Sequence, residues 1–230
     1  MYTKRFVCLA NSRKTTGRCI AGKEVFPNGA FGPWIRPVSS RQTQELKDRE
    51  RKLQRGGDPS LLDILEIGLK EPLPHDHQSE NHLIDERYHW IRRGFCSWNQ
   101  LRVAVDVVES LWGTGNSSHY GVNDRVSGAA ARHFQNSLML INPQDFRVEI
   151  VTEPTEFSER PRARAHFTFR GEEYRFSITD PVAEQHYFPR GNGVYPLESV
   201  LLCVSLGEPH TDGNCYKFCA GVLTPGWSIC

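Results

Sequence analysis

The sequence predicts a mainly β protein with short helices, folded as two consecutive OB-like five-stranded barrels. Short apolar or alternating runs recur along the chain and are separated by turns rich in Gly, Asn and Pro. In each half, the expected order is a set of strands, one helix and then two strands, which is the order of the OB barrel. A single irregular α+β domain is the alternative, because the halves share no visible sequence identity.

The first half supplies the elements of one barrel. Strands are predicted at residues 5–10, 18–21, 33–38, 61–69 and 88–92. The polar stretch Asn11–Gly17 is predicted as the loop between the first two strands. Gln42–Gln54 lacks Gly and Pro and is rich in strong helix formers, so it is predicted as a surface helix. Glu71–Asp85 is expected to be an ordered loop, and Ser97 is expected to cap a helix that ends near Leu111.

The second half is more regular. Strands are predicted at residues 137–141, 146–152, 162–169, 174–179, 200–206 and 216–223. Arg170-Gly171 is predicted as a hairpin turn, and Asp180-Pro181 is a good start for a short helix. The long stretch Gly113–Gly128 is expected to be a loop, and loops of this length are usually functional or disordered. These elements predict a barrel with a trailing helix at 1–112, a connecting loop at 113–136 and a second barrel at 137–230.

Composition limits the class of protein. The chain of 230 residues carries 28 Lys and Arg against 27 Asp and Glu. No apolar run approaches the 18 or so residues of a membrane span, and the N-terminus lacks the apolar core of a signal peptide. We therefore expect a cytoplasmic protein without a membrane partner. Its seven cysteines are odd in number and form no CxxC pair, so they are expected to be reduced and mostly structural.

Positive charge is concentrated near the N-terminus. Residues 1–41 contain eight basic residues and one acidic residue, a net charge of +7 in a chain whose total is +1. OB barrels bind single strands with cationic loops and with aromatic rings that stack on bases. Candidate ligand-binding residues here are Asn11, Ser12, Arg13, Lys14, Arg18, Trp34 and Arg36. The alternatives are a solvated basic loop and a tryptophan that belongs to the core.

A second candidate is the histidine-rich segment from Pro74 to Asp85. His75 and His77 would point the same way in an extended segment, so His75, His77, Glu80 and His82 could ligate a metal. The spacing matches no standard zinc motif. A recognition loop that uses His75, His77, Gln78 and Asn81, or a purely structural loop, are the other interpretations.

The third candidate is the segment that contains Tyr216 and Lys217, which is expected to flank a pocket. No phosphate-binding loop, dinucleotide fingerprint, HExxH or GxSxG motif occurs in the sequence. We therefore assign no catalytic residue and expect no cofactor.

Several segments also resemble a known family. They are CLANSRK at Cys8–Lys14, WIRPVS at Trp34–Ser39, PHDHQSENHLID at Pro74–Asp85, ITDP at Ile178–Pro181 and CVSLGEP at Cys203–Pro209. These segments are similar to those of the bacterial dual-OB-fold (DuOB) proteins. The resemblance implies nucleic-acid or nucleotide sensing in bacterial conflict and defence loci, and it carries over no catalytic residue.

Together, these patterns predict a non-enzymatic module that binds nucleic acid or a nucleotide-like ligand. Single strands, a modified base or a small nucleotide are favoured, because a net charge of +1 gives weak bulk attraction to duplex DNA. One alternative is a metal-assisted hydrolase or nuclease that uses the His75–His82 segment. Another is an adaptor for a neighbouring effector protein, with Gln42–Gln54 as its docking surface.

Overall fold

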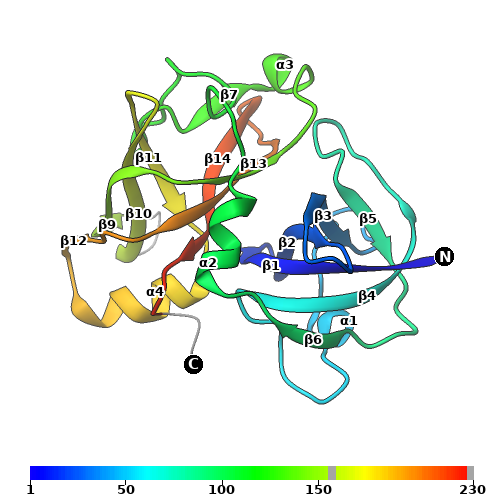
Figure 1. The fold of residues 1–230 in the computed structure, drawn as a ribbon. Helices are drawn as coiled ribbons and strands as arrows, with labels where there is room; N and C mark the ends of the chain where they lie inside the picture. The colour runs from blue at the N-terminus through cyan, green and yellow to red at the C-terminus, as the bar shows by residue number, and fades with distance from the viewer. Residues whose placement is uncertain (155–158, 227–230) are drawn as a thin grey trace. The chain divides into compact units, whose positions relative to one another are not determined.

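The structure, a computed structural model, describes residues 1–154 and 159–226 and divides the chain into two compact units (Figure 1). The first unit is formed mainly by Met1–Ala104, together with the short segment Gln135–Ser137. The second unit consists of Val105–Phe134 and Leu138–Pro225. Each unit is built on one β-sheet, so the predicted mainly β class is confirmed.

The first unit is a closed barrel. Its strands are β1 (Tyr2–Lys14), β2 (Gly17–Val25), β3 (Phe31–Val38), β4 (Asp63–Pro72), β5 (Asn81–Ile84) and the edge strand β6 (Ile91–Phe95). The strand order is β1-β2-β3-β5-β4, and a β1–β4 pairing closes the ring. The long strand β1 makes this possible because its first half pairs with β4 and its second half pairs with β2. β3 and β5 pair in parallel. This order and the closure are those of an OB barrel.

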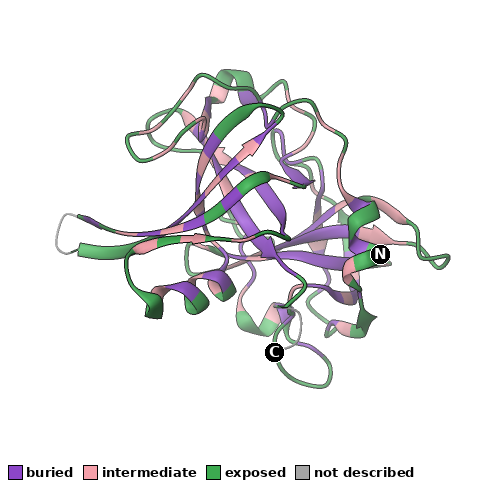
Figure 2. Cartoon of the chain, turned by 60° about the vertical axis from the view of Figure 1, so that its left-hand side comes forward, coloured by how far each residue is buried: buried purple, intermediate pink, exposed green. Residues whose placement is uncertain are grey.

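The core of this barrel consists of apolar side chains that point inward from the strands. Phe6, Ile35 and Leu65 are fully buried, and Trp90 packs edge-on against Phe6. Each such side chain contributes about 1.5–3 kcal/mol through removal of apolar surface from water. Figure 2 shows buried residues along the strands and exposed residues mainly in the connections.

The predicted helix over Gln42–Gln54 is wrong: only α1 (Asp48–Arg51) is helical. Leu46 and Leu53 are buried, and each sits in an isolated β-bridge, to Arg18 and to Trp90 respectively. Backbone pairing and burial of the two leucines override the local helix propensity.

The boundaries of other elements also differ from the prediction. The predicted loop over Asn11–Gly17 is wrong. Strand β1 continues to Lys14, strand β2 begins at Gly17, and only two threonines join them. Thr15 adopts φ +47° in this tight turn. Cross-strand hydrogen bonds continue through the polar residues, which the polar composition of the segment did not indicate.

The segment predicted as a loop at Glu71–Asp85 contains the end of β4 and all of β5. Ser97 does cap a helix, as predicted, but α2 (Trp98–Leu101) and η1 (Arg102–Ala104) end well before Leu111.

The second unit repeats the barrel order with a broken first strand. Its strands are β7 (Arg125–Ser127), β8 (Leu138–Ile141), β9 (Gln144–Pro154), β10 (Glu159–Phe169), β11 (Glu172–Ile178), β12 (Gly193–Pro196), β13 (Leu201–Pro209) and β14 (Asn214–Leu223). β8 pairs with β13 and β9 pairs with β10, so together they take the place that β1 holds in the first barrel. Asn142-Pro143 separates them, and proline cannot donate a ladder hydrogen bond. β11 and β14 pair in parallel, as β3 and β5 do.

Two local features predicted in the second unit, the Arg170-Gly171 turn and the helix start at Asp180-Pro181, are present in the structure. Arg170 and Gly171, at φ +53° and +82°, form the turn between β10 and β11. Asp180 caps α4 (Pro181–Tyr187) by accepting a 2.9 Å hydrogen bond from the amide of Val182. The remaining helices are α3 (Gly128–Ala131) and η2 (Phe188–Arg190).

Candidate ligand-binding site

A polar pocket of about 440 Å³ lies in the second unit. It is lined by Ser118, His119, Tyr120, Asp124, Arg125, Arg164, Ser177 and Tyr216. The first four belong to the connection before β7, and the others come from β7, β10, β11 and β14. A volume of this size is in the usual range for small-ligand sites. Ligands of OB barrels bind on the face of the second and third strands, which here are β10 and β11.

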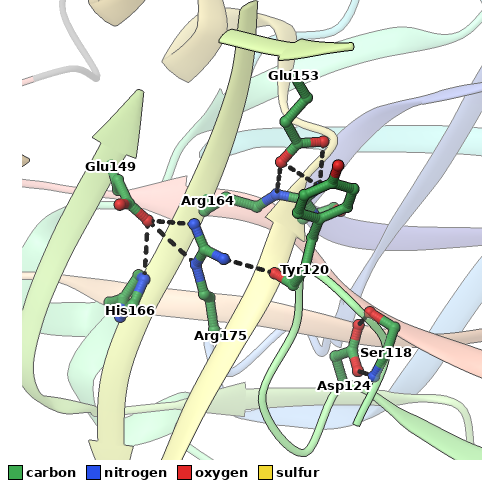
Figure 3. Close-up of polar contacts among 9 residues, drawn as sticks. Ser118, Tyr120, Asp124, Glu149, Glu153, Arg164, His166 and Arg175 are labelled. Atoms are coloured by element: carbon green, nitrogen blue, oxygen red, sulfur yellow. Dashed lines mark hydrogen bonds and ion pairs between the residues drawn. The ribbon is translucent and has the colours of Figure 1, made fainter. Parts of the chain in front are cut away.

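The connection over this pocket is held by its own acidic residue. The carboxylate of Asp124 accepts hydrogen bonds from the backbone amide and the hydroxyl of Ser118, at 2.7 and 2.6 Å (Figure 3). The backbone carbonyl of Asp124 accepts a 2.7 Å bond from the amide of Lys217 on β14. Asp124 therefore closes the loop on itself through Ser118 and attaches it to β14 through Lys217.

Strand β11 provides a second attachment. Arg175 Nη1 donates a 2.8 Å hydrogen bond to the backbone carbonyl of Tyr120, and the backbones of Arg175 and Val122 bond in both directions. The same guanidinium also donates to Glu149 Oε2, which accepts a 2.9 Å hydrogen bond from His166 Nε2 as well. Burial opposes ionisation of Glu149, but the bonds from Arg175 and His166 outweigh it and lower its pKa.

The side chain of Lys217, on β14, also holds the loop before β7. Its side chain is buried, and its Nζ donates to the backbone carbonyls of Gly113 and Asn123 at 2.7 and 2.8 Å. Burial lowers the pKa of Lys217 to about 8. Sequence analysis proposed Lys217 as a ligand contact, whereas in the structure its ammonium holds the loop.

Arg164 forms the inner wall of the pocket. Its side chain is about one-tenth exposed and makes a bidentate ion pair with Glu153 at 2.7 Å. Its Nη1 donates to the hydroxyl of Ser177, and its guanidinium lies 5.8 Å from the ring centre of Tyr120. Figure 3 shows Tyr120 next to this ion pair. An aromatic ring is thus held at the pocket by a cation that a carboxylate already neutralises.

The mouth of the pocket contains Arg125 and Tyr216. The hydroxyl of Tyr216 donates to Asp212 Oδ2 at 2.7 Å, and hydrogen bonds from Tyr216 and Asn214 hold the pKa of Asp212 at about 2. Arg125 Nε donates to Asn116 Oδ1, and its Nη1 lies 3.7 Å from Asp212. Arg125 is the more exposed and less tightly paired of the two pocket arginines.

Three of the six residues predicted in the histidine-rich segment, Gln78, Glu80 and Asn81, meet Arg36 in a buried polar cluster of the first unit. Arg36 Nη2 lies 3.2 Å from Glu80 Oε1, which also accepts a hydrogen bond from Ser137. Asn81 accepts from Arg36 at 3.4 Å and donates to Gln78 at 3.2 Å. These groups are buried and bond to one another, so the cluster is built as an internal support for β3 and β5.

The two histidines of this segment do not point the same way, which corrects the expected metal geometry. His75 is exposed, whereas His77 is 1% exposed. Asp76, at φ +49°, forms a turn between them in place of an extended segment. His82 bonds through Nδ1 to the hydroxyl of Tyr2 at 2.6 Å. Within residues 1–154 and 159–226, no group of three or more His, Cys, Asp or Glu side chains could hold a metal ion.

The remaining predicted residues lie on the β1–β2 hairpin and on β3. Asn11 donates to the carbonyl of Pro59 at 2.8 Å, and Ser12 to that of Cys19 at 3.4 Å. Arg13 faces Arg18 across the hairpin, with Lys14 at its tip. Trp34 is half-buried, and Lys23 Nζ lies 5.6 Å from its ring centre. These residues belong to the first unit, whereas the pocket residues belong to the second.

Sequence reasoning missed most of the pocket. Of its lining residues only Tyr216 was a candidate, although residues 113–128 were expected to form a functional or disordered loop. The alternation of residues 162–169 was a usable signal, since it places Arg164 and His166 on one face of β10. Nothing in the local sequence indicated that this face meets the loop.

The six cysteines in the described part of the chain form no disulfide with one another. Among the helices of residues 1–154 and 159–226, none is long and apolar enough to cross a membrane.

Two barrels with the OB strand order, one of which carries a pocket at its second and third strands, define an OB-fold protein. The chain belongs to the family of the dual OB-containing domain, whose sequence model matches residues 4–222. The resemblance to dual-OB proteins is thereby confirmed. No curated protein and no solved structure matches the chain. OB barrels commonly bind nucleic acids or other oligomers.

Proposed function

We propose that this chain binds nucleic acid or a nucleotide through the pocket of its second unit. The observation that carries the proposal is the pairing of aromatic and cationic side chains at one pocket on the ligand-binding face of an OB barrel. Tyr120, Tyr216 and His119 provide rings for stacking, which is worth about 1–3 kcal/mol per base in single-strand binding. Arg125 provides a partly exposed cation for a phosphate.

The balance of charges at the pocket favours a small ligand over a long nucleic-acid strand. Glu153 and Asp212 lie against the pocket arginines, so the local field is nearly balanced. A long polyanion needs many uncompensated cations, whereas one nucleotide of a single strand needs few. The ligand is therefore a nucleotide, a modified base or a short single-stranded segment. A sensing role in bacterial defence, which the family resemblance implies, is the biological setting of this proposal.

Binding can be measured by fluorescence anisotropy with short single-stranded DNA and RNA over a series of salt concentrations. We expect affinity to fall with salt, and Arg125→Ala to weaken binding and reduce the magnitude of the logarithmic salt slope by about one. Arg132→Ala, which removes an exposed arginine that does not line the pocket, is the matched control. Arg13→Ala and Lys14→Ala test the hairpin of the first unit in the same assay.

Absence of binding to every oligonucleotide and nucleotide would refute the proposal. Equal loss in Arg125→Ala and Arg132→Ala would refute the pocket as the site. If only Arg13→Ala and Lys14→Ala weaken binding, the ligand binds to the first barrel.

A further inference from the structure

We propose that the pocket selects a purine with a 6-oxo group, such as guanine, over adenine, and that Arg164 and Ser177 read this difference. The inference rests on the proposed function and names the ligand class of the same site. Its basis is an inventory of which hydrogen-bonding groups at the pocket are already engaged and which remain available.

Arg164 has one N–H left for a ligand. A guanidinium carries five N–H donors. Nε donates to Glu153 Oε1 at 3.0 Å, and Nη2 donates to both carboxylate oxygens at 2.7 Å. Nη1 donates to Ser177 Oγ, and its second hydrogen has no protein acceptor among the described residues. The side chain is held on both sides, so this donor has a fixed position in the pocket wall.

Ser177 provides the second donor. Its oxygen accepts the bond from Arg164, and the hydroxyl proton has no acceptor within residues 1–154 and 159–226. A hydroxyl that accepts from a cation can still donate its own proton. Two donors from neighbouring strands therefore lie side by side at the pocket wall.

The carboxylates at and beside the pocket already accept hydrogen bonds from protein groups. Asp124 is bonded to Ser118, Glu153 to Arg164, and Asp212 to Tyr216. A ligand that presents donors meets carboxylates that are already hydrogen-bonded, whereas a ligand that presents two adjacent acceptors pairs with the available donors of Arg164 and Ser177. Guanine presents O6 and N7 as neighbouring acceptors, and adenine replaces the O6 acceptor by an amino donor. The two purines stack alike, so the difference in binding arises at this edge.

The test compares GMP, IMP and AMP by calorimetry on the full chain. IMP keeps O6 and N7 but lacks the 2-amino group of guanine, so it isolates the edge in question. We expect GMP and IMP to bind about tenfold more tightly than AMP, because AMP leaves a donor of the site unpaired. Ser177→Ala should reduce this ratio to within about threefold through weaker GMP and IMP binding. Ser177→Thr keeps the hydroxyl and should retain the preference.

Equal affinity for GMP and AMP would overturn this inference and leave the proposed function intact. An unchanged ratio in Ser177→Ala, with melting temperature preserved, would also overturn it. If none of the three nucleotides and no oligonucleotide binds, the proposed function fails together with the inference.

Discussion

Arg175 joins the loop before β7, which contains Tyr120 and lines the pocket, to the second barrel. Its Nη1 donates a 2.8 Å hydrogen bond to the backbone carbonyl of Tyr120. The same guanidinium donates to Glu149 Oε2 at 2.6 Å, and this bond orients it toward the Tyr120 carbonyl. A surface ion pair alone would contribute little, but here it orients a donor for a backbone carbonyl. The position of the Tyr120 ring at the pocket thus depends on a charge on β11.

Arg175→Met should loosen this loop without unfolding the barrel. The backbone bonds between Arg175 and Val122 survive the substitution, so the bonds lost are those of the side chain to the Tyr120 carbonyl and to Glu149. We expect faster amide hydrogen exchange over residues 116–123 and nucleotide affinity lower by roughly three- to tenfold. His166→Gln removes the other side chain on Glu149 and leaves Arg175 in place, so it should change neither quantity. Unaltered exchange in Arg175→Met would show that the loop is held without this bond.

Lys217→Met tests the buried ammonium. The substitution leaves the carbonyls of Gly113 and Asn123 without their donor while it keeps most of the side-chain volume. We expect the free energy of unfolding to fall by about 2 kcal/mol, because two part-buried carbonyls lose the hydrogen bonds from a charged donor. Chemical denaturation measures this change. Lys52→Met removes an exposed lysine and should leave stability within about 0.5 kcal/mol.

Lys217 should also make stability depend on pH. Burial lowers its pKa in the folded protein to about 8, below its usual value of 10.5. Between these values the unfolded chain binds more protons than the folded chain, so the Lys217 contribution to stability rises with pH and is smallest below pH 8. We expect the stability difference between the wild type and Lys217→Met to shift in favour of the wild type by about 1–2 kcal/mol from pH 7.5 to 10. A difference that does not change with pH would contradict this prediction.

The buried ion pair between Arg36 and Glu80 should support the first barrel. Both side chains are about 4% exposed, so removal of one leaves the other charge buried. We expect Arg36→Met to cost about 3–5 kcal/mol. The double variant Arg36→Met, Glu80→Gln should be more stable than the sum of the two single losses predicts, because it removes both charges. Additive losses in urea unfolding would indicate that the two residues do not interact.

Local sequence patterns predicted much of the fold because the information lay within a few residues. Strict alternation fixed β10 and β11, and Arg170-Gly171 fixed their turn. The caps at Ser97 and Asp180 marked true helix starts, because a short polar side chain satisfies amides two or three residues ahead. Order of elements alone was then sufficient to predict two OB-like barrels.

The same local rules failed where distant segments compete for the backbone. Gln42–Gln54 has the composition of a helix, but Leu46 and Leu53 pair with other segments and are buried. Arg36 and His77 looked like ligand contacts because charge and aromaticity are readable from sequence, whereas burial is not.

The sequence by itself determined the class of this protein: the strands, their turns, the helix caps and the concentration of positive charge near the N-terminus. Only the tertiary structure decided where a ligand could bind. The pocket joins the loop before β7 to residues of β10, β11 and β14, which are up to about a hundred positions away. Such a site has no local pattern, because its geometry arises from strand pairing and from the long-range bonds of Arg175 and Lys217.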